Sequence, residues 1–328
     1  MPPRVLLTDP IDPCGEQLLR ARGARISLAP DGAADTVRRL ARDADALIVR
    51  SRLPDDIFEA APDVRAVTIH GTGTDLVPLA SATQHGVAVA NLPGANAQSV
   101  AEYCAMGMLM LARNTAVISA AMKQRPWDEA RALGAQAREL GGLTAGIVGV
   151  GEIGRRLAQI LHRGFDMRVL GHQRRLDRLP PGVEPAALEA LLAQSDFVVV
   201  AVPLTQQTHH LFDRERIAAM KPGAWLINVG RGAVVEEAAL VDALRTRRIG
   251  GAVLDVYEHY RIDPGHPLLQ LDNVLLTPHL AGMTHESRAR SGVRAAEETL
   301  RMLAGDAPHH FVNPEVWSRF RERGPQDR

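Results

Sequence analysis

Cysteine is scarce in this sequence. Cys14 and Cys104 are the only two cysteines among 328 residues, and they lie far apart. A disulfide framework or a thiolate metal site needs more cysteines or closer spacing, so we expect neither, and we expect a reducing, cytoplasmic location. The pairs His209-His210 and His309-His310 lack the spacing of a helical metal-binding motif, so we interpret them as solvated surface residues and expect no metal.

A charge excess is absent and aromatic residues are few. Lysine plus arginine and aspartate plus glutamate both total 38, so the formal net charge is zero, and 4% of the residues are aromatic. A nucleic-acid interface normally combines a basic surface with interleaved aromatic side chains. An anionic membrane surface also attracts basic proteins. We therefore expect neither nucleic acid nor a membrane as a partner.

No apolar run reaches membrane-spanning length. The most apolar stretch, residues 104–122, is interrupted by Arg113 and Asn114, whereas a spanning helix needs about 20 apolar residues. The short apolar run at the N-terminus meets Asp9 and Asp12, so it lacks the core of a secretory signal. We predict that residues 99–123 form one long buried helix.

Short apolar segments rich in β-forming residues recur along the chain, with helix-like segments such as residues 36–44 between some of them. This alternation predicts parallel βαβ units and therefore an α/β fold. The segments of the second series are enough for a complete doubly wound sheet of the Rossmann type. The first series comprises residues 4–8, 46–50, 66–70 and 87–91, and the second comprises residues 145–150, 167–171, 197–202, 224–229, 251–256 and 273–278.

Length and composition allow two domains. With 328 residues, of which 46% are hydrophobic and 23% charged, the chain can bury two cores. A second long helix is predicted at residues 286–305 and is expected to return to the first domain. We therefore predict a smaller discontinuous α/β domain of residues 1–98 and 288–328, and a Rossmann domain of residues 99–287. The helix at residues 99–123 is the expected hinge.

A glycine motif follows the first strand of the second series. Gly149, Gly151 and Gly154 have the spacing G-x-G-x-x-G and stand between an apolar strand and an amphipathic helix. The first glycine permits a tight turn, the second lets the backbone approach a pyrophosphate, and the third lets helix and strand pack closely. A glycine-rich turn without a ligand is the alternative, but the five further strands favour a dinucleotide site.

The end of the next strand bears on which dinucleotide is bound. An acid about 20 residues after the glycines typically binds the ribose 2′-hydroxyl of NAD, but Gln173 occupies that position and Arg174 and Arg175 follow it. A 2′-phosphate would be repelled by an acid and gripped by arginine forks. NADP is therefore favoured and NAD remains possible, unless both arginines simply solvate a loop.

Arg231 and His279 follow two later strand segments. Ligands of open α/β sheets bind at the carboxyl ends of the strands, so both side chains could converge there. Reduction of a 2-oxo acid needs a cation that holds the carboxylate and polarises the carbonyl, and an acid that protonates the oxygen. Arginine can hold a carboxylate with two hydrogen bonds, and histidine exchanges protons near neutral pH.

From about residue 4 to residue 315 the sequence resembles the D-isomer-specific 2-hydroxyacid dehydrogenase family, which includes phosphoglycerate dehydrogenases and glyoxylate/hydroxypyruvate reductases. The segments that carry the resemblance occur in the family's order: VRS, GTGTD, NLPGANAQSVAEY, GIVGVGEIGRRLA, VPLTQQTHHLF, MKPGAWLINVGRGAVV, LDVYEH and TPHLAG. The resemblance implies a Rossmann domain plus a smaller flavodoxin-like α/β substrate domain. It also implies hydride transfer between NAD(P)H and a small 2-oxo acid to give a D-2-hydroxy acid, and a homodimer built on the helix after Asn96.

The resemblance also assigns residue roles. Arg231 would bind and polarise the substrate while His279 exchanges the proton. Backbone N–H groups of Gly71, Thr72 and Gly73 would bind the substrate carboxylate, and Asn96 would lie near the reacting centre. On the cofactor side it implies Glu152 and Ile153 at the pyrophosphate, Pro203 and Thr208 near the dinucleotide, the carbonyl of Val229 with Gly230 beside it, and Asp255 at the nicotinamide amide.

The sequence departs from the family where an acid normally pairs with the catalytic histidine. The Glu-Pro pair expected there is replaced by Tyr260-Arg261. Two alternatives remain: Tyr260 hydrogen-bonds His279, which we favour, or a loop adjustment brings Glu258 into the acid's place. The substrate stays open, because Arg50, Arg52 and His70 could bind a second anionic group or lie on the surface. A nucleotide-sensing corepressor-like scaffold of the same architecture is the rival function.

Overall fold

The computed structural model describes residues 2–322 and divides into two compact units. The terminal unit contains the residues up to Asn96 together with those from Met283 onward, and the central unit is Ala97–Gly282. These divisions lie two and five residues before the predicted domain boundaries at residues 98 and 287.

The terminal unit is built on a five-stranded parallel sheet. The strand order 2-1-3-4-5 is that of flavodoxin-like folds, as predicted. Strand β2 was not predicted, because it lies at the sheet edge and three of its four residues are exposed, which leaves no apolar run in the sequence. The strands are β1 (Arg4–Leu7), β2 (Arg25–Leu28), β3 (Ala46–Val49), β4 (Ala66–Ile69) and β5 (Ala88–Ala90).

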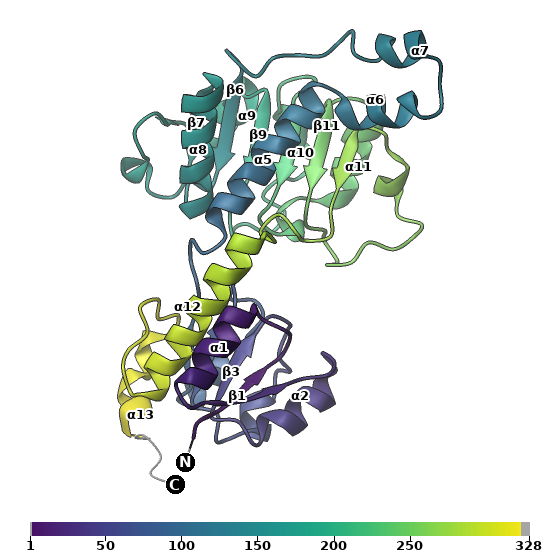
Figure 1. Cartoon of the computed structure of the whole chain (residues 1–328). Coiled ribbons are helices and arrows are strands. Elements are labelled where there is room, and N and C mark those ends of the chain that lie inside the picture. Colours follow the sequence, from purple (N-terminus) through teal and green to yellow (C-terminus); the bar gives the residue numbers. More distant parts are fainter. Residues whose placement is uncertain (1, 323–328) are drawn as a thin grey trace. The chain divides into compact units, whose positions relative to one another are not determined.

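Helices cover the sheet of the terminal unit. The predicted second long helix is present as α12 (His285–Leu303), which packs on α1 (Pro13–Ala21) and on strands β3 and β4 (Figure 1). The close crossing needs glycine, because a Cβ at Gly15 would lie 2.4 Å from the carbonyl oxygen of Gly292. The other helices are α2 (Ala34–Ala41), α3 (Ile57–Ala60), α4 (Leu79–Gln84) and α13 (Trp317–Glu322).

The central unit contains a seven-stranded parallel sheet in the order β12-β11-β10-β9-β6-β7-β8. This is the doubly wound Rossmann order. Successive strands are added to one side of β6 up to β8, and then to the other side from β9 onward, so the strand order reverses between β6 and β9 while all strands stay parallel. The six predicted strands are present, and a two-residue edge strand, β8, was not predicted. The strands are β6 (Thr144–Val148), β7 (Arg168–His172), β8 (Glu184–Pro185), β9 (Phe197–Val200), β10 (Trp225–Asn228), β11 (Gly251–Leu254) and β12 (Val274–Leu276).

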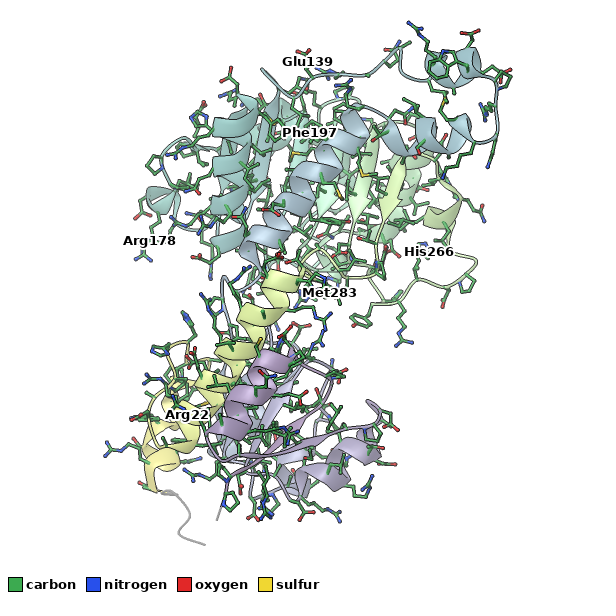
Figure 2. The ribbon with its side chains drawn as sticks, in the orientation of Figure 1. Arg22, Glu139, Arg178, Phe197, His266 and Met283 are labelled. Atoms are coloured by element: carbon green, nitrogen blue, oxygen red, sulfur yellow. The ribbon has the colours of Figure 1, made fainter. Side chains whose placement is uncertain are left out.

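Both faces of this sheet are covered, which explains its continuous apolar strands. Ile147, Phe197 and Val199 pack beneath α5 (Ala97–Ala112) and α8 (Glu152–Phe165), and Figure 2 shows Phe197 in this layer. Alternate residues such as Val198 and Val200 face the other helices, because successive strand side chains point to opposite faces. Those helices are α9 (Leu188–Gln194), α10 (Arg214–Ala219) and α11 (Glu237–Arg245).

The prediction of one long helix over residues 99–123 was wrong. The segment is broken into α5 and α6 (Thr115–Met122), bent by 61° at the break, and a short helix α7 (Trp127–Ala132) follows. The break occurs at Asn114, whose φ of 51° is left-handed and incompatible with a continuing α-helix.

No single helix within residues 2–322 is long and apolar enough to cross a membrane. The bent pair α5–α6 together has the length and composition of a membrane-spanning segment. However, α5 is mostly buried and packs on the Rossmann sheet.

Candidate active site

Three candidate residues follow three neighbouring strands of the central unit. Arg231 comes after β10, Asp255 after β11 and His279 after β12, and these strands are adjacent in the sheet. Backbone hydrogen bonds join the strand ends: Asp255 N donates to Asn228 O at 3.2 Å, and His279 N donates to Asp255 O at 2.9 Å. The three residues therefore share the carboxyl edge of the sheet, where open α/β folds bind ligands.

The backbone around Arg231 is held closely. Asn228 accepts a hydrogen bond from Gly230 N and donates one to Arg231 O, each at 3.1 Å. A Cβ at Gly232 would lie 1.9 Å from the backbone of Tyr257, so only glycine fits there. The guanidinium is half-buried, and its Nη1 donates to the carbonyl of Gly230 at 3.0 Å. The arginine is thus placed by packing rather than by a flexible loop.

His279 is exposed and lies in a turn that wraps around a buried carboxylate. Asp255 is 2% exposed. Its Oδ1 accepts from Thr277 Oγ1 at 2.6 Å and from Leu280 N at 2.8 Å, and its Oδ2 accepts from Ala281 N at 2.9 Å. A carboxylate offers about four acceptor positions, so most of those on Asp255 support the histidine turn, and few are left for the nicotinamide amide that sequence analysis assigned to it.

Tyr260 and Glu258 have different surroundings. The ring of Tyr260 stands edge-on to that of His279, with centroids 6.1 Å apart, and the tyrosine is 70% exposed. Glu258 accepts from His210 Nε2 at 2.8 Å and from Glu237 N at 3.2 Å. Burial raises the pKa of the Glu258 carboxyl, but these hydrogen bonds outweigh burial, and the pKa lies below its ordinary value. Glu258 is therefore part of a separate pair with His210.

The interpretation of the histidine pairs as solvated surface residues was incomplete. His210 is half-buried against Glu258, and the Nδ1 atom of His309 lies 2.5 Å from Glu298 Oε1. Outside the two pairs, His266 also faces a carboxylate: its Nε2 lies 2.9 Å from Glu237 Oε1. The partners are far away in sequence, so no local pattern could have indicated these contacts.

The glycine loop between β6 and α8 has a different constraint at each glycine. Gly149 has a φ of 99°, and a Cβ there would lie 2.7 Å from Ala201. A Cβ at Gly154 would lie 2.5 Å from the carbonyl oxygen of Gly149, so the third glycine allows α8 to pack on its strand. A Cβ at Gly151 would meet nothing within 4 Å. Protein packing thus explains the first and third glycines, whereas Gly151 borders open space.

The start of α8 fits a phosphate group. Gly151 is the N-cap, and Glu152 and Ile153 are the first helical residues. The first N–H groups of a helix have no partner within it and face outward at the positive end of the helix dipole. An anion seated on Gly151 would therefore meet these groups directly.

The remaining cofactor candidates lie at the same sheet edge. Thr208 Oγ1 donates to Pro203 O at 2.6 Å in the loop after β9, and Val229 N donates to Val200 O at 3.1 Å after β10. Beyond β7, Gln173 donates to Arg175 O at 2.7 Å.

The two arginines after Gln173 differ in their contacts. The fork of Arg175 holds Asp177 through bonds of 3.2 and 3.0 Å. The exposed Arg174 side chain makes no hydrogen bond or ion pair with the part of the chain that the structure describes.

The predicted substrate-binding residues Gly71, Thr72, Gly73 and Asn96 belong to the terminal unit. The loop after β4 is joined to the end of β5: Leu92 N donates to Gly71 O, and Asn91 Nδ2 donates to Thr72 O, each at 2.7 Å. Gly71 N already donates to Ile69 O at 2.8 Å. Thr72 and Gly73 are therefore better candidate donors to a carboxylate than Gly71.

Comparison with known proteins now decides the family. Residues 105–281 match the family model of the D-isomer specific 2-hydroxyacid dehydrogenase NAD binding domain. The chain is 37% identical over 285 residues to a glyoxylate reductase of Thermofilum pendens, covering 84% of this chain and 83% of that protein. The chain belongs to the D-isomer-specific 2-hydroxyacid dehydrogenases. It is therefore an NAD(P)-dependent oxidoreductase acting on 2-oxo and 2-hydroxy acids.

Solved structures support the same fold for this dehydrogenase. An NADPH-dependent glyoxylate/hydroxypyruvate reductase of Sinorhizobium meliloti, in complex with NADP and malonate, is similar with a TM-score of 0.84 and 28% identity, covering 96% of this chain and 98% of that one. A formate dehydrogenase of Staphylococcus aureus in complex with NAD has a TM-score of 0.81 and 26% identity, covering 91% and 95%. One of these two structures holds NADP and the other holds NAD.

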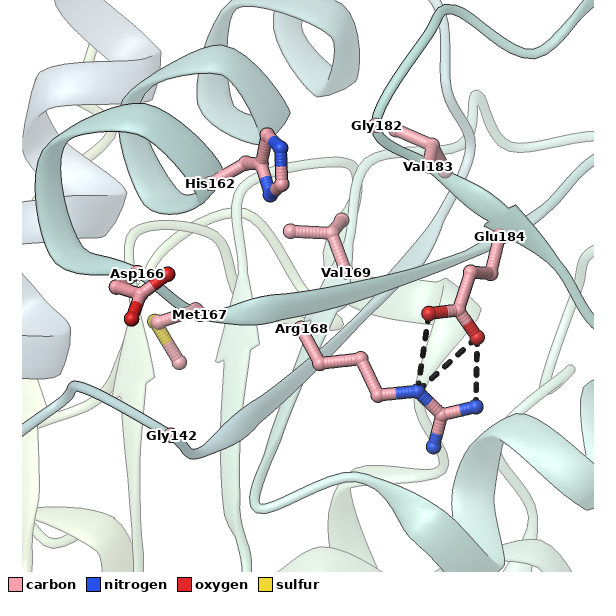
Figure 3. A pocket seen from close by; sticks show the side chains of 9 residues that line it. All are labelled: Gly142, His162, Asp166, Met167, Arg168, Val169, Gly182, Val183 and Glu184. Carbon is pink, nitrogen blue, oxygen red and sulfur yellow. Dashed lines mark hydrogen bonds and ion pairs between the residues drawn. The ribbon is translucent and has the colours of Figure 1, made fainter.

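A cavity of about 430 Å³ in the central unit of the dehydrogenase is separate from the candidate cofactor residues (Figure 3). Its lining includes Asp166, Met167 and Arg168, which lie before or at the start of β7, whereas Gln173 follows the strand's carboxyl end. Figure 3 shows the Arg168 fork facing Glu184, with bonds of 2.7 to 3.2 Å that lower the pKa of Glu184. The cavity is therefore at the opposite end of the strand from the candidate cofactor residues.

His70, directly after β4, is set apart by its burial. Its Nε2 is buried without a hydrogen-bond partner within residues 2–322. The pKa of His70 is lowered to about 4, first by desolvation and then by the charges of Arg50 and Arg288, which outweigh a backbone hydrogen bond and Asp12. The imidazole is therefore neutral at pH 7 in the folded dehydrogenase.

This depressed pKa predicts acid sensitivity. Between the folded pKa of about 4 and the unfolded value of 6.5, the unfolded chain binds more protons at His70, so the stability present above pH 6.5 is lost as the pH falls through 4. We expect the unfolding free energy of the wild type to fall from pH 7 to pH 4.5 by on the order of 2 kcal/mol more than that of His70→Gln. Urea unfolding of both variants measures this difference, and an NMR titration of His70 near 6.5 would contradict it.

Proposed function

We propose that this dehydrogenase reduces a small 2-oxo acid to the D-2-hydroxy acid, with His279 as the proton donor and Arg231 as the ligand of the substrate carboxylate. The observation that carries the proposal is the placement of these two side chains after β10 and β12, the strands on either side of β11 in one sheet, with their loops joined by hydrogen bonds through Asp255 at the end of β11. Guanidinium and imidazole are the two groups that this reduction requires.

A bound reduced nicotinamide supplies a hydride to the carbonyl carbon of the substrate. Arg231 holds the carboxylate and polarises the carbonyl, because a guanidinium stabilises the negative charge that develops on the oxygen. Protonated His279 donates its proton to that oxygen and takes it back in the reverse reaction. In the terminal unit, Thr72 and Gly73 are the proposed backbone N–H donors to a substrate carboxylate, and Asn96 is proposed to act near the reacting centre. Asp255 holds the histidine turn of the central unit.

Tyr260 replaces the usual acid as the neighbour of His279. We infer this from the edge-on ring contact of 6.1 Å and from the engagement of Glu258 with His210. A neutral tyrosine orients the imidazole without adding a negative charge.

The pyrophosphate of the cofactor would be held by Gly151, Glu152 and Ile153 at the start of α8, on a turn whose packing needs Gly149 and Gly154. Pro203, Thr208, the carbonyl of Val229 and Gly230 would lie near the dinucleotide. The open space beside Gly151 supports this assignment. NADP is favoured over NAD because Gln173 brings no negative charge to the ribose, and because Arg174 makes no hydrogen bond or ion pair within residues 2–322 that a 2′-phosphate would have to replace.

Arg174→Ala is expected to raise the KM for NADPH about tenfold and to leave the KM for NADH nearly unchanged, because a charge-assisted hydrogen bond to phosphate contributes about 1.5 kcal/mol or more. Arg175→Ala is the matched control. Its effect should be smaller, because Arg175 already binds Asp177. Steady-state kinetics with both nucleotides measures the difference, and an unchanged KM for NADPH in Arg174→Ala would rule out the proposed contact.

A homodimer formed through α5, α6 and α7 is the proposed assembly, in a reducing, cytoplasmic setting that suits two free cysteines. These helices expose Met106, Leu109, Met122 and Trp127 to between 38% and 65%. Exposed large apolar side chains on consecutive helices are a common feature of protein interfaces. Sedimentation velocity at micromolar concentration should therefore give about twice the mass of one chain, and a monomer would contradict the proposal.

The decisive test of the function follows NADPH and NADH oxidation with glyoxylate, hydroxypyruvate and larger 2-oxo acids. At least one of these acids should be reduced by the wild type to its 2-hydroxy acid, with the D configuration where the product is chiral. Tyr260→Phe should remain active, because it keeps the ring that stands edge-on to His279. Absence of turnover with every acid, in a protein that still binds nucleotide, would contradict the proposal.

A further inference from the structure

A buried tyrosine extends the hydrogen-bonded support of the His279 turn into the core of the central unit. Tyr103 of α5 is 8% exposed, and its hydroxyl lies 2.5 Å from Thr277 Oγ1. The Thr277 hydroxyl in turn donates to Asp255 Oδ1 at 2.6 Å. A continuous line of hydrogen bonds therefore runs from the first helix of the unit, through the loop after β12, to the carboxylate at the end of β11.

Which group donates each hydrogen bond in this line is fixed. An ionised carboxylate can only accept hydrogen bonds, so the Thr277 hydroxyl proton points to Asp255. The Tyr103 hydroxyl must then donate to the remaining lone pairs of Thr277 Oγ1. Burial raises the pKa of Tyr103 to about 12, so the phenol keeps the proton that it donates. Tyr103 consequently fixes both the rotamer of Thr277 and the orientation of its hydroxyl.

The turn needs such support because His279 adopts a strained backbone conformation. Its φ is 55°, in the left-handed region that residues other than glycine rarely occupy. Support comes from Asp255, which binds the amides of Leu280 and Ala281, and from the Tyr257 hydroxyl, which donates to Thr277 O at 2.9 Å. Without the Tyr103 hydroxyl, Thr277 Oγ1 would be left under-satisfied and free to turn away from Asp255.

We propose that Tyr103 is a positioning residue for His279, acting through the line Tyr103–Thr277–Asp255 that fixes the turn of residues 277–281. The proposal rests on the proposed function of His279 as proton donor, but the state of the turn can be measured without turnover. Tyr103 itself touches neither substrate nor cofactor in this role. Its effect is on how often the imidazole occupies the position from which it can donate.

The test removes one hydroxyl at a time with shape-matched variants. Tyr103→Phe is expected to lower kcat about tenfold, to leave the KM for NADPH within about twofold, and to raise the amide exchange rates of Leu280 and Ala281 about tenfold. Thr277→Val should produce the same changes, while Thr277→Ser should restore near-normal values because it keeps the hydroxyl. Tyr103→Phe should have no further effect in the Thr277→Val background, because both substitutions break the same line.

Two results would overturn the proposal. One is unchanged amide exchange at Leu280 and Ala281 in Tyr103→Phe, measured on the protein without substrate. The other is full additivity of Tyr103→Phe and Thr277→Val, which would mean that Tyr103 acts by a route other than Thr277. If the wild type reduces no 2-oxo acid, the proposed function fails, and amide exchange alone still decides whether Tyr103 holds the turn.

Discussion

Replacing His279 by glutamine is expected to lower kcat about a thousandfold, because general acid catalysis by a positioned side chain contributes between about a hundredfold and ten-thousandfold. Glutamine is neutral and can still hydrogen-bond the carbonyl oxygen, but it has no proton to transfer. The KM for NADPH should stay within about twofold, since the glycine loop before α8 is untouched. Steady-state kinetics over a range of pH measures both constants, and the pH dependence assigned to the histidine should vanish.

The fold should tolerate this substitution. His279 is exposed, and backbone amides and the Thr277 hydroxyl supply the hydrogen bonds that hold its turn on Asp255. The matched control is His259→Gln, which changes an exposed histidine one residue before Tyr260 and should leave kcat unchanged. If His279→Gln retained more than about a tenth of the wild-type kcat, another group would have to be the proton donor.

Gly151→Ala should weaken NADPH binding about a hundredfold without destabilising the protein. A Cβ at Gly151 would meet no protein atom within 4 Å, and the N-cap backbone, with φ of −79° and ψ of −154°, suits alanine. The added methyl group would occupy the space in which a pyrophosphate approaches the helix N-terminus, at the cost of about two charge-assisted hydrogen bonds. Titration with NADPH gives the Kd, and urea unfolding gives the stability.

Gly154→Ala is the contrasting variant on the same loop. A Cβ there would lie 2.5 Å from the carbonyl oxygen of Gly149 and 3.2 Å from Ile147 Cγ2, so α8 must shift away from its strand. We expect the unfolding free energy to fall by about 3 kcal/mol, as for overpacking at a rigid contact. Equal stability losses in the two variants, or unchanged NADPH affinity in Gly151→Ala, would contradict the assignment of Gly151 to the cofactor.

Much of the architecture could be predicted because its signals are local. Continuous apolar runs marked the buried strands β3, β4, β9 and β11, and the glycine spacing marked the turn into α8. The prediction failed where burial is partial or the chain bends: β2 and β8 are edge strands, and Asn114 ends α5 through a left-handed residue. Neither an exposed edge strand nor a single left-handed residue leaves a periodic pattern in the sequence.

The candidate site, too, could be predicted from the sequence only in part. Arg231 and His279 could be singled out from their positions after strand segments, because side chains at the carboxyl ends of parallel strands meet at one edge. The support of His279 by Asp255, Thr277 and Tyr103 joins residues up to 174 positions apart in the sequence, and the pairing of Glu258 with His210 spans 48 positions. No spacing rule connects such residues.

The amino-acid sequence by itself determined the fold class, the family, and which residue types stand at the ends of which strands, since periodicity and motif order are properties of the chain. Only the tertiary structure decided which polar groups are already engaged: Asp255 by the histidine turn, Arg175 by Asp177 and Glu258 by His210. It also decided that a side chain at Gly151 would project into open space while one at Gly154 would clash. The physical reason is that hydrogen bonding and excluded volume depend on atoms brought together from distant parts of the chain.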